Sequence, residues 1–186
     1  MLKGKKVVLR EKRLEDAAND YAWRSDEELA RLDAAPTLRM SFMEFLANYA
    51  DELRYPSPQR RRFAIETLDG KHIGNCMYYD IDEDRGEAEL GIMIGDRDYW
   101  DQGYGADAIT TLLDHIFSTT KLNRIYLNTL EWNIRAQRCF QKCGFVPIEQ
   151  ARRHNRDFIV MEIYRSSWER SASAKGVRAR NEKREG

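Results

Sequence analysis

The chain has 186 residues, of which 31 are Lys or Arg and 31 are Asp or Glu, so its formal net charge is zero. This length suits one domain with a sizeable core, and the balanced charge excludes an overall field that would draw the chain to nucleic acid or to an anionic membrane. Apolar residues make up 42% of the sequence, which excludes a chain disordered throughout. No apolar run approaches the ~20 residues of a membrane span, and the run after the basic N-terminus is too short for a signal peptide. We therefore expect a cytoplasmic protein.

The first part of the chain predicts one strand and three helical segments, at 7–10, 14–23, 26–32 and 41–53. Pro36 ends the second helical segment, because proline has no backbone N–H to donate. Ser41 and Glu44 form a capping box at the start of the third. Tyr55 and the two prolines after it stop that helix.

Alternating apolar residues then predict an antiparallel meander of three strands, at 63–68, 72–81 and 87–94. Asp69-Gly70 is a strong two-residue hairpin turn, and the polar run 82–86 makes the second turn. Apolar residues at helical spacing from Ala108 to Phe117 predict the next helix. The remaining elements are a strand, a helix between the N-cap Asn133 and the stop signal Gly144, and a final strand, at 124–130, 133–143 and 157–164.

From Ser166 the periodic pattern stops. Residues 171–186 carry five basic side chains and almost no large apolar residue. We therefore divide the chain into a domain over 1–165 and a disordered basic tail over 166–186. A contact of this tail with RNA or the ribosome is the alternative to a solvated tail.

The three cysteines are Cys76, Cys139 and Cys143. An odd number without a secretory signal argues for reduced thiols. Cys139 and Cys143 would share one face of a helix, but no further Cys or His lies close to them in the sequence. A metal site needs such additional ligands, so the sequence predicts no metal.

Gly103 and Gly105 lie where a strand passes into a helix, between Trp100 and Ala108. Such a turn directs free backbone N–H groups to one spot, and the helix N-terminus adds partial positive charge there. Together they suit a phosphate or pyrophosphate, to which glycine permits close approach. A P-loop is excluded because no Lys follows Gly105, and the dinucleotide fingerprint is excluded because residue 108 is Ala. A glycine turn without a ligand is the alternative.

A second motif, N-x-x-A-x-x-x-F-x-x-x-G-F over 133–145, follows about thirty residues further along. Together with G-x-G-A at 103–106 it resembles the GNAT acetyltransferases, and within them the branch with the ribosomal-protein alanine N-acetyltransferases. The resemblance covers residues 5–165. It implies an α+β fold whose central mixed, mostly antiparallel sheet is flanked by helices and splayed between its fourth and fifth strands, here 87–94 and 124–129.

The resemblance also implies acetyl-CoA as co-substrate, with its pantetheine arm paired to the strand 87–94 as an extra strand would be. The thioester carbonyl would meet a backbone N–H near Ile92, Met93 or Ile94, which would stabilise the developing oxyanion. The implied cofactor contacts in the two motifs are Gln102, Gly103, Tyr104, Gly105, Ala106, Asn133, Arg138, Phe140 and Lys142. Arg138 and Lys142 would reach the phosphates or else merely solvate their helix. Trp100 replaces the Gln or Arg usual in the family, so a backbone role is expected there and a side-chain role is in doubt.

Acetylation of an amine requires a group that takes the proton of the amine. Strand alternation places Glu87, Glu89, Gly91 and Met93 on one face. Glu89 matches the position at which this branch carries its general-base glutamate, and the alternative is a strand carboxylate that holds an arginine. Glu87, beside the turn, is expected to be exposed.

The proton for the leaving thiolate has no obvious donor. Phe140 stands where many family members have a tyrosine, and phenylalanine has no proton to give. Tyr99, Tyr126, water and unassisted departure of the thiolate are the open alternatives.

By resemblance, the chain transfers an acetyl group from acetyl-CoA to a primary amine by direct attack on the thioester. A protein N-terminus, an amino acid, a polyamine and an aminoglycoside stay open as acceptors. Trp23 and Asp33 would face the acceptor, or else be a core tryptophan and a solvated carboxylate. A non-catalytic CoA-binding or regulatory module, indicated by Phe140, and an adaptor held to RNA by the tail are the other functions. No membrane partner is expected, and a homodimer is left open.

Overall fold

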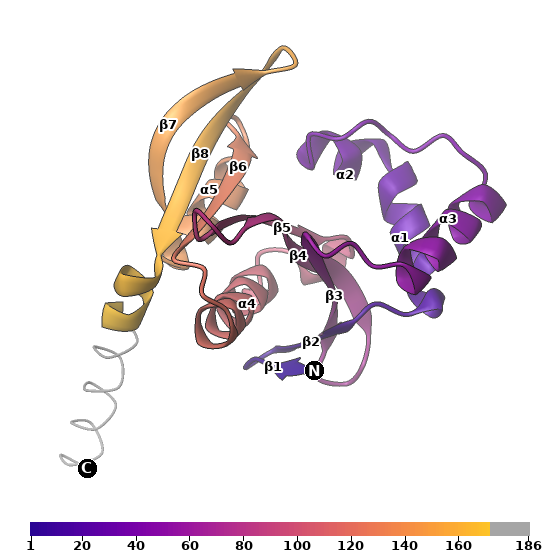
Figure 1. Ribbon diagram of the computed structural model, residues 1–186. Helices are drawn as coiled ribbons and strands as arrows, with labels where there is room; N and C mark the ends of the chain where they lie inside the picture. Colours follow the sequence, from indigo (N-terminus) through magenta and orange to yellow (C-terminus); the bar gives the residue numbers. More distant parts are fainter. Residues whose placement is uncertain (172–186) are drawn as a thin grey trace.

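The computed structural model of the chain describes residues 1–171. The strands are β1 (Leu2–Lys3), β2 (Val7–Glu11), β3 (Arg60–Thr67), β4 (His72–Asp82), β5 (Glu87–Ile94), β6 (Arg124–Leu130), β7 (Val146–Arg153) and β8 (Arg156–Tyr164). They form one sheet in the order β1-β2-β3-β4-β5-β6-β8-β7 (Figure 1). Every neighbouring pair is antiparallel except β5 and β6, which run parallel. The predicted α+β fold with a mixed, mostly antiparallel sheet is confirmed.

The helices are α1 (Ala17–Ser25), α2 (Glu27–Leu32), α3 (Phe42–Arg54), α4 (Tyr104–Thr119) and α5 (Ile134–Lys142), and 3-10 turns at Leu14–Asp16 and Arg97–Tyr99 precede α1 and α4. Helices α1, α2 and α3 gather together, apart from α4 (Figure 1). The predicted capping box at α3 is confirmed, because the Ser41 hydroxyl accepts the Glu44 N–H while the Glu44 carboxylate accepts the Ser41 N–H.

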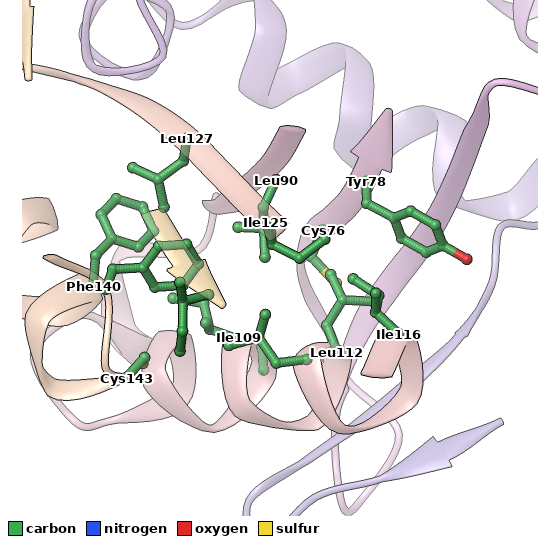
Figure 2. Close-up of a cluster of buried hydrophobic side chains, with 14 of the residues drawn as sticks. Cys76, Tyr78, Leu90, Ile109, Leu112, Ile116, Ile125, Leu127, Phe140 and Cys143 are labelled. Atoms are coloured by element: carbon green, nitrogen blue, oxygen red, sulfur yellow. The ribbon is translucent and has the colours of Figure 1, made fainter. Parts of the chain in front are cut away.

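The core forms between α4 and the strands. Its helical side is the predicted apolar stripe of α4, all of it buried: Ala108, Ile109, Leu112, Leu113, Ile116 and Phe117. Figure 2 shows this stripe directed at side chains of the strands, among them Cys76, Leu90 and Ile125. Each fully buried aliphatic side chain contributes roughly 1.5–3 kcal/mol. The core therefore fixes the position of α4, and with it the start of that helix.

One strand, β7, was missing from the prediction. Seven of its eight residues are exposed, so it shows no alternation of apolar and polar side chains. Its turn to β8 uses His154 and Asn155, both at positive φ, in place of a glycine-containing hairpin signal. An edge strand open to solvent on both faces carries no period-2 pattern that a sequence could show.

The predicted start of the tail at Ser166 is also wrong for the part of the chain that the structure describes. Residues 165–171 are helical. Trp168 packs against Phe117, with ring centroids 6.4 Å apart, and donates its indole N–H to Asp114 at 2.9 Å. Arg165 donates to the carbonyl of Thr120 at 3.0 Å. The other residues of the predicted tail, 172–186, lie outside the described part. None of the helices within residues 1–171 is long and apolar enough to cross a membrane.

We predict that Trp168→Ala lowers the free energy of unfolding by about 1–3 kcal/mol, less than for a fully buried tryptophan, because the ring is half-buried. Thermal melting should show a loss of roughly 3–10 °C. Truncation after Glu169 is the control, since it keeps Trp168 and the two described residues that it removes, Arg170 and Ser171, are exposed. An equal loss in the truncated protein would show that the chain after Glu169 stabilises the domain.

Candidate functional site

The parallel strands β5 and β6 pair only over their first residues. Glu87, Ala88 and Glu89 pair with Arg124, Ile125 and Tyr126. Both strands then continue, β5 to Ile94 and β6 to Leu130, without further pairing to each other. The edge of β5 after Glu89 therefore presents backbone groups that an extended ligand can pair with.

A cleft of about 740 Å³ begins at this splay and extends beneath α1–α3. Strand β5 supplies residues 89–93, among them Glu89 and the predicted oxyanion positions Ile92 and Met93, whereas Ile94 does not line it. Strand β6 supplies a second wall with Asn128 and Thr129, and α5 with its N-cap supplies a third with Asn133, Ala136 and Phe140. The helical segment α1–α3 and its loops supply a fourth with Trp23, Asp33 and Tyr49. One cavity thus joins the expected cofactor side to the expected acceptor side.

The start of α4 is open for an anion. Its N-cap is Gly103, at φ +85°, and no side chain caps the helix. The first N–H groups of this 16-residue helix, at Tyr104, Gly105 and Ala106, are therefore left for a ligand. Gly103 is required by its backbone, since its φ lies in the left-handed region.

Gly105 has a different explanation. It lies inside α4, and an added Cβ would meet its nearest neighbours, Cys139 Sγ and Ile94 Cγ1, at an ordinary 3.7 Å. Neither its backbone nor its packing within the protein demands glycine. Close approach of a ligand to the start of the helix does provide a reason.

Trp100 contacts the protein itself. Its indole N–H donates to the Ile94 carbonyl at 2.7 Å, and its ring stacks on the Arg135 guanidinium, 3.7 Å from the ring centroid. Arg135 has no carboxylate partner among the described residues and lies one helical turn before Cys139, which faces Gly105. The sequence analysis missed this cation, although the spacing of four between Arg135 and Cys139 places both on one helix face.

The other predicted cofactor residues are placed less directly. Asn133 caps α5 by accepting the Ala136 N–H at 3.2 Å, so only its side-chain N–H₂ group is left for a ligand. Arg138 and Lys142 are exposed on α5, and Gln102 is exposed before α4. None of these three lines the cleft.

Glu89 is held by neutral donors. Asn128 Nδ2 donates to Glu89 Oε1 at 2.9 Å. Tyr79, opposite Glu89 on β4, donates its hydroxyl proton to the same carboxylate. Burial first, and then the negative charge of Glu89, raises the pKa of Tyr79. The sequence analysis identified neither donor.

Glu87 corrects the expectation of exposure. Its side chain is only 15% exposed and forms ion pairs with Arg124 at 2.7 Å and with Arg85 at 3.2 Å. It, rather than Glu89, is the strand carboxylate that holds an arginine.

The two tyrosines considered as proton donors pack against other side chains. Tyr99 packs edge-on against Tyr104 at 5.0 Å, and Tyr126 lies beside Arg124 at 4.8 Å. Neither lines the cleft. Phe140, which does, is buried against Phe145.

Both residues expected at the acceptor end line the cleft. Trp23 also packs edge-on against His72 at 4.9 Å and covers Gly95, where an added Cβ would lie 2.1 Å from the ring. Asp33 keeps contact with solvent in the cleft, but the surrounding protein displaces enough water to raise its pKa to about 6. Arg24 is the nearby cation that opposes this rise.

A buried ionic network fixes the helical wall of the cleft to the sheet. Asp20 on α1 accepts from Lys12 at 2.8 Å, from the Tyr49 hydroxyl at 3.0 Å and from Asn75 at 2.7 Å. Burial lowers the pKa of Lys12. Within residues 1–171 no group of three or more His, Cys, Asp or Glu side chains comes together as a metal site would require.

Comparison with known proteins shows which family this fold and cleft belong to. The family model described as an acetyltransferase (GNAT) domain matches residues 6–146. An uncharacterized N-acetyltransferase p20 of Bacillus licheniformis is 29% identical over 121 residues, which are 64% of this chain and 67% of the relative. A spermine/spermidine N(1)-acetyltransferase of Bacillus subtilis is 34% identical over 82 residues, 41% of this chain and 54% of the relative, so the match spans about half of that protein.

Among solved structures, spermidine N-acetyltransferase from Vibrio cholerae in complex with CoA and spermine is similar with a TM-score of 0.78 at 22% identity. The match covers 88% of this chain and 98% of the other. At this identity the likeness shows the fold. The named relatives include polyamine acetyltransferases. They do not point specifically to the ribosomal-protein branch that the sequence motifs resemble.

Proposed function

This chain belongs to the acetyltransferase (GNAT) family, and we propose that it transfers the acetyl group of acetyl-CoA to a primary amine of a small molecule. The observation that carries the proposal is a single cleft that joins the unpaired edge of β5, near the open start of α4, to Glu89. The same cleft continues to the helical wall, where an acceptor has room.

Acetyl-CoA fits this arrangement by its chemistry. Its pyrophosphate suits the uncapped N–H groups of α4, and Gly105 leaves room for it. Arg135, held flat against Trp100, adds a cation beside that position. The pantetheine arm suits the unpaired edge of β5. A backbone N–H of residues 92–94 would polarise the thioester carbonyl.

In the proposed reaction Glu89 takes the proton of the amine, directly or through a water, as the amine attacks the thioester carbon. Glu89 suits this role because it lines the cleft and neutral donors hold it. The cleft offers no acidic group at Phe140 for the leaving sulfur. A CoA thiol is acidic enough to leave as the thiolate, which then takes a proton from water.

For the acceptor we propose a diamine or polyamine. Relatives of this chain are named for spermine and spermidine. Asp33 and Glu89 both line the cleft and both act electrostatically on Tyr79, so Tyr79 lies within reach of two separate carboxylates. One carboxylate can take the proton of the reacting amine while the other binds a second ammonium group of the same molecule. A protein N-terminus offers no such second ammonium unless a lysine follows it.

We predict that acetyl-CoA raises the melting temperature. At a hundredfold excess over Kd the gain is about 2.7 kcal/mol. Gly105→Val should abolish this shift while the unliganded protein still melts cooperatively, and Gly105→Ala should weaken it less. A wild-type protein with no shift and no calorimetric signal would contradict the cofactor assignment. Binding without turnover of any amine would instead indicate a non-catalytic CoA-binding module.

Glu89→Gln should lower kcat/KM at pH 7 by at least tenfold, because a general base contributes about 10²–10⁴-fold. The Kd of acetyl-CoA should stay within a few-fold, and part of the activity should return at high pH, where solvent deprotonates the amine. The assay follows thiol release, with a thermal melt of each variant. Normal turnover of the variant at pH 7 would exclude Glu89 as the base.

Asp33→Asn should raise KM for spermidine at least tenfold and leave KM for a simple monoamine nearly unchanged. Below pH 6 Asp33 is protonated, so the wild-type preference for spermidine should grow as the pH rises through about 6, and the variant should lack this rise. The variant should be at least as stable as the wild type at pH 7, because the raised pKa means that the folded protein disfavours the charged form. Asp84→Asn, in an exposed turn, is the control. An equal rise in KM for both amines would contradict the role.

A further inference from the structure

Asn128 joins Glu89 to the neighbouring strand, and we propose that it is a positioning residue that fixes the Glu89 carboxylate for proton transfer at a cost in stability. The proposal rests on the proposed function, in which Glu89 takes the proton of the amine.

The position of Asn128 sets its role. Glu89 is the last residue of β5 that pairs with β6, and its partner there is Tyr126. Asn128 lies two residues further along β6, where the strands have parted, and its Nδ2 still reaches Glu89 Oε1 at 2.9 Å. A side-chain hydrogen bond thus continues across the splay where the backbone pairing stops. Without it, Glu89 would have a donor only from the β4 side, at Tyr79.

The other atom of the same amide has no partner. Asn128 Oδ1 is buried, and no described residue donates a hydrogen bond to it. A buried acceptor without a donor costs about 1–3 kcal/mol. An apolar side chain of similar size would avoid that cost, so packing alone does not account for an asparagine here. Its bond to Glu89 does.

The two glutamates on this face of β5 show what an amide donor achieves. Glu87 is held by two guanidinium groups, which bring full positive charges within 2.7 and 3.2 Å. These two ion pairs engage the Glu87 carboxylate with cations, and Glu87 does not line the cleft. Glu89 receives neutral donors, Asn128 and Tyr79. They fix the direction of its lone pairs but leave it able to take a proton.

The test is a double-mutant cycle of Asn128→Leu and Glu89→Gln, with kcat, KM and the pH profile measured in the thiol-release assay. Asn128→Leu should melt at the wild-type temperature or higher, since it removes the unpaired acceptor. It should lower kcat at least tenfold and change the acetyl-CoA Kd by no more than a few-fold. The double variant should be no slower than Glu89→Gln alone, because Asn128 acts through Glu89.

The loss in Asn128→Leu should fall on kcat and leave KM for the amine within a few-fold, because Asn128 positions the Glu89 carboxylate and is not proposed to bind the amine. The other titratable groups around it remain in place: Tyr79 and Asp80 of β4, Tyr126 of β6 and Asp33 after α2. Asn48→Leu, an asparagine of α3 that lines the same cleft without contacting Glu89, is the matched control, and its effect on kcat should be additive with that of Glu89→Gln.

Three results would overturn the role of Asn128 alone. These are wild-type kcat in Asn128→Leu, a fall in melting temperature of several degrees in that variant, and a loss of activity additive with that of Glu89→Gln. A wild-type protein that binds acetyl-CoA but acetylates no amine would instead overturn the proposed function, and the role of Asn128 with it.

Discussion

Two parallel strands that part after three residue pairs determine the layout of this molecule. Strand β5 stays with β4, and β6 stays with β8, so the right-handed twist of the two halves carries them apart (Figure 1). An unpaired strand edge is normally a liability that a protein covers. Here it lines a cleft, and the two groups that we assign to the proton transfer, Glu89 and Asn128, lie at the point where the pairing ends.

Helix α4 connects the core to this cleft. Its buried stripe fixes the helix against the sheet (Figure 2). The same helix presents its uncapped N-terminus near the end of β5, where Gly105 lies beside Ile94. Trp100 adds a second connection, because it bonds to the last carbonyl of β5 and supports Arg135 of α5. The end of β5, the start of α4 and the more distant helix α5 therefore meet at the anion-binding position that we propose.

The helical wall is fixed in a different way. Asp20 collects three hydrogen-bonding partners, Asn75 of β4, Tyr49 of α3 and Lys12 just after β2, in a buried setting where an unpaired carboxylate would be costly. This network ties the helical wall to β4, the strand that pairs with β5 and so with the strand of Glu89. Asp33, also on that wall, is not part of the network and faces the cleft. Rigid support and a polar group for the acceptor are thus supplied by different residues.

The sequence by itself determined most of the elements and the family. Local side-chain chemistry sets the helical spacing in α4, the capping box at Ser41 and the alternation in β4 and β5. Each of the two glycine-containing motifs is an unbroken stretch of sequence, so each can be read directly. The edge strand β7 escaped prediction because solvent on both faces removes alternation. The short helix over 165–171 escaped it because its stability comes from Trp168 packing on α4.

Only the tertiary structure decided the roles of individual polar residues. Glu87 and Glu89 share a face of one strand, and the sequence predicted neither the partners of Glu89 nor the burial of Glu87. Arginines hold the first and neutral donors hold the second, and those partners come from β4, β6 and the β4–β5 turn. Trp100 and Arg135 are likewise brought together from different segments. A hydrogen bond depends on distance in space, and for residues tens of positions apart that distance is set by the packing of the sheet and helices rather than by the local sequence.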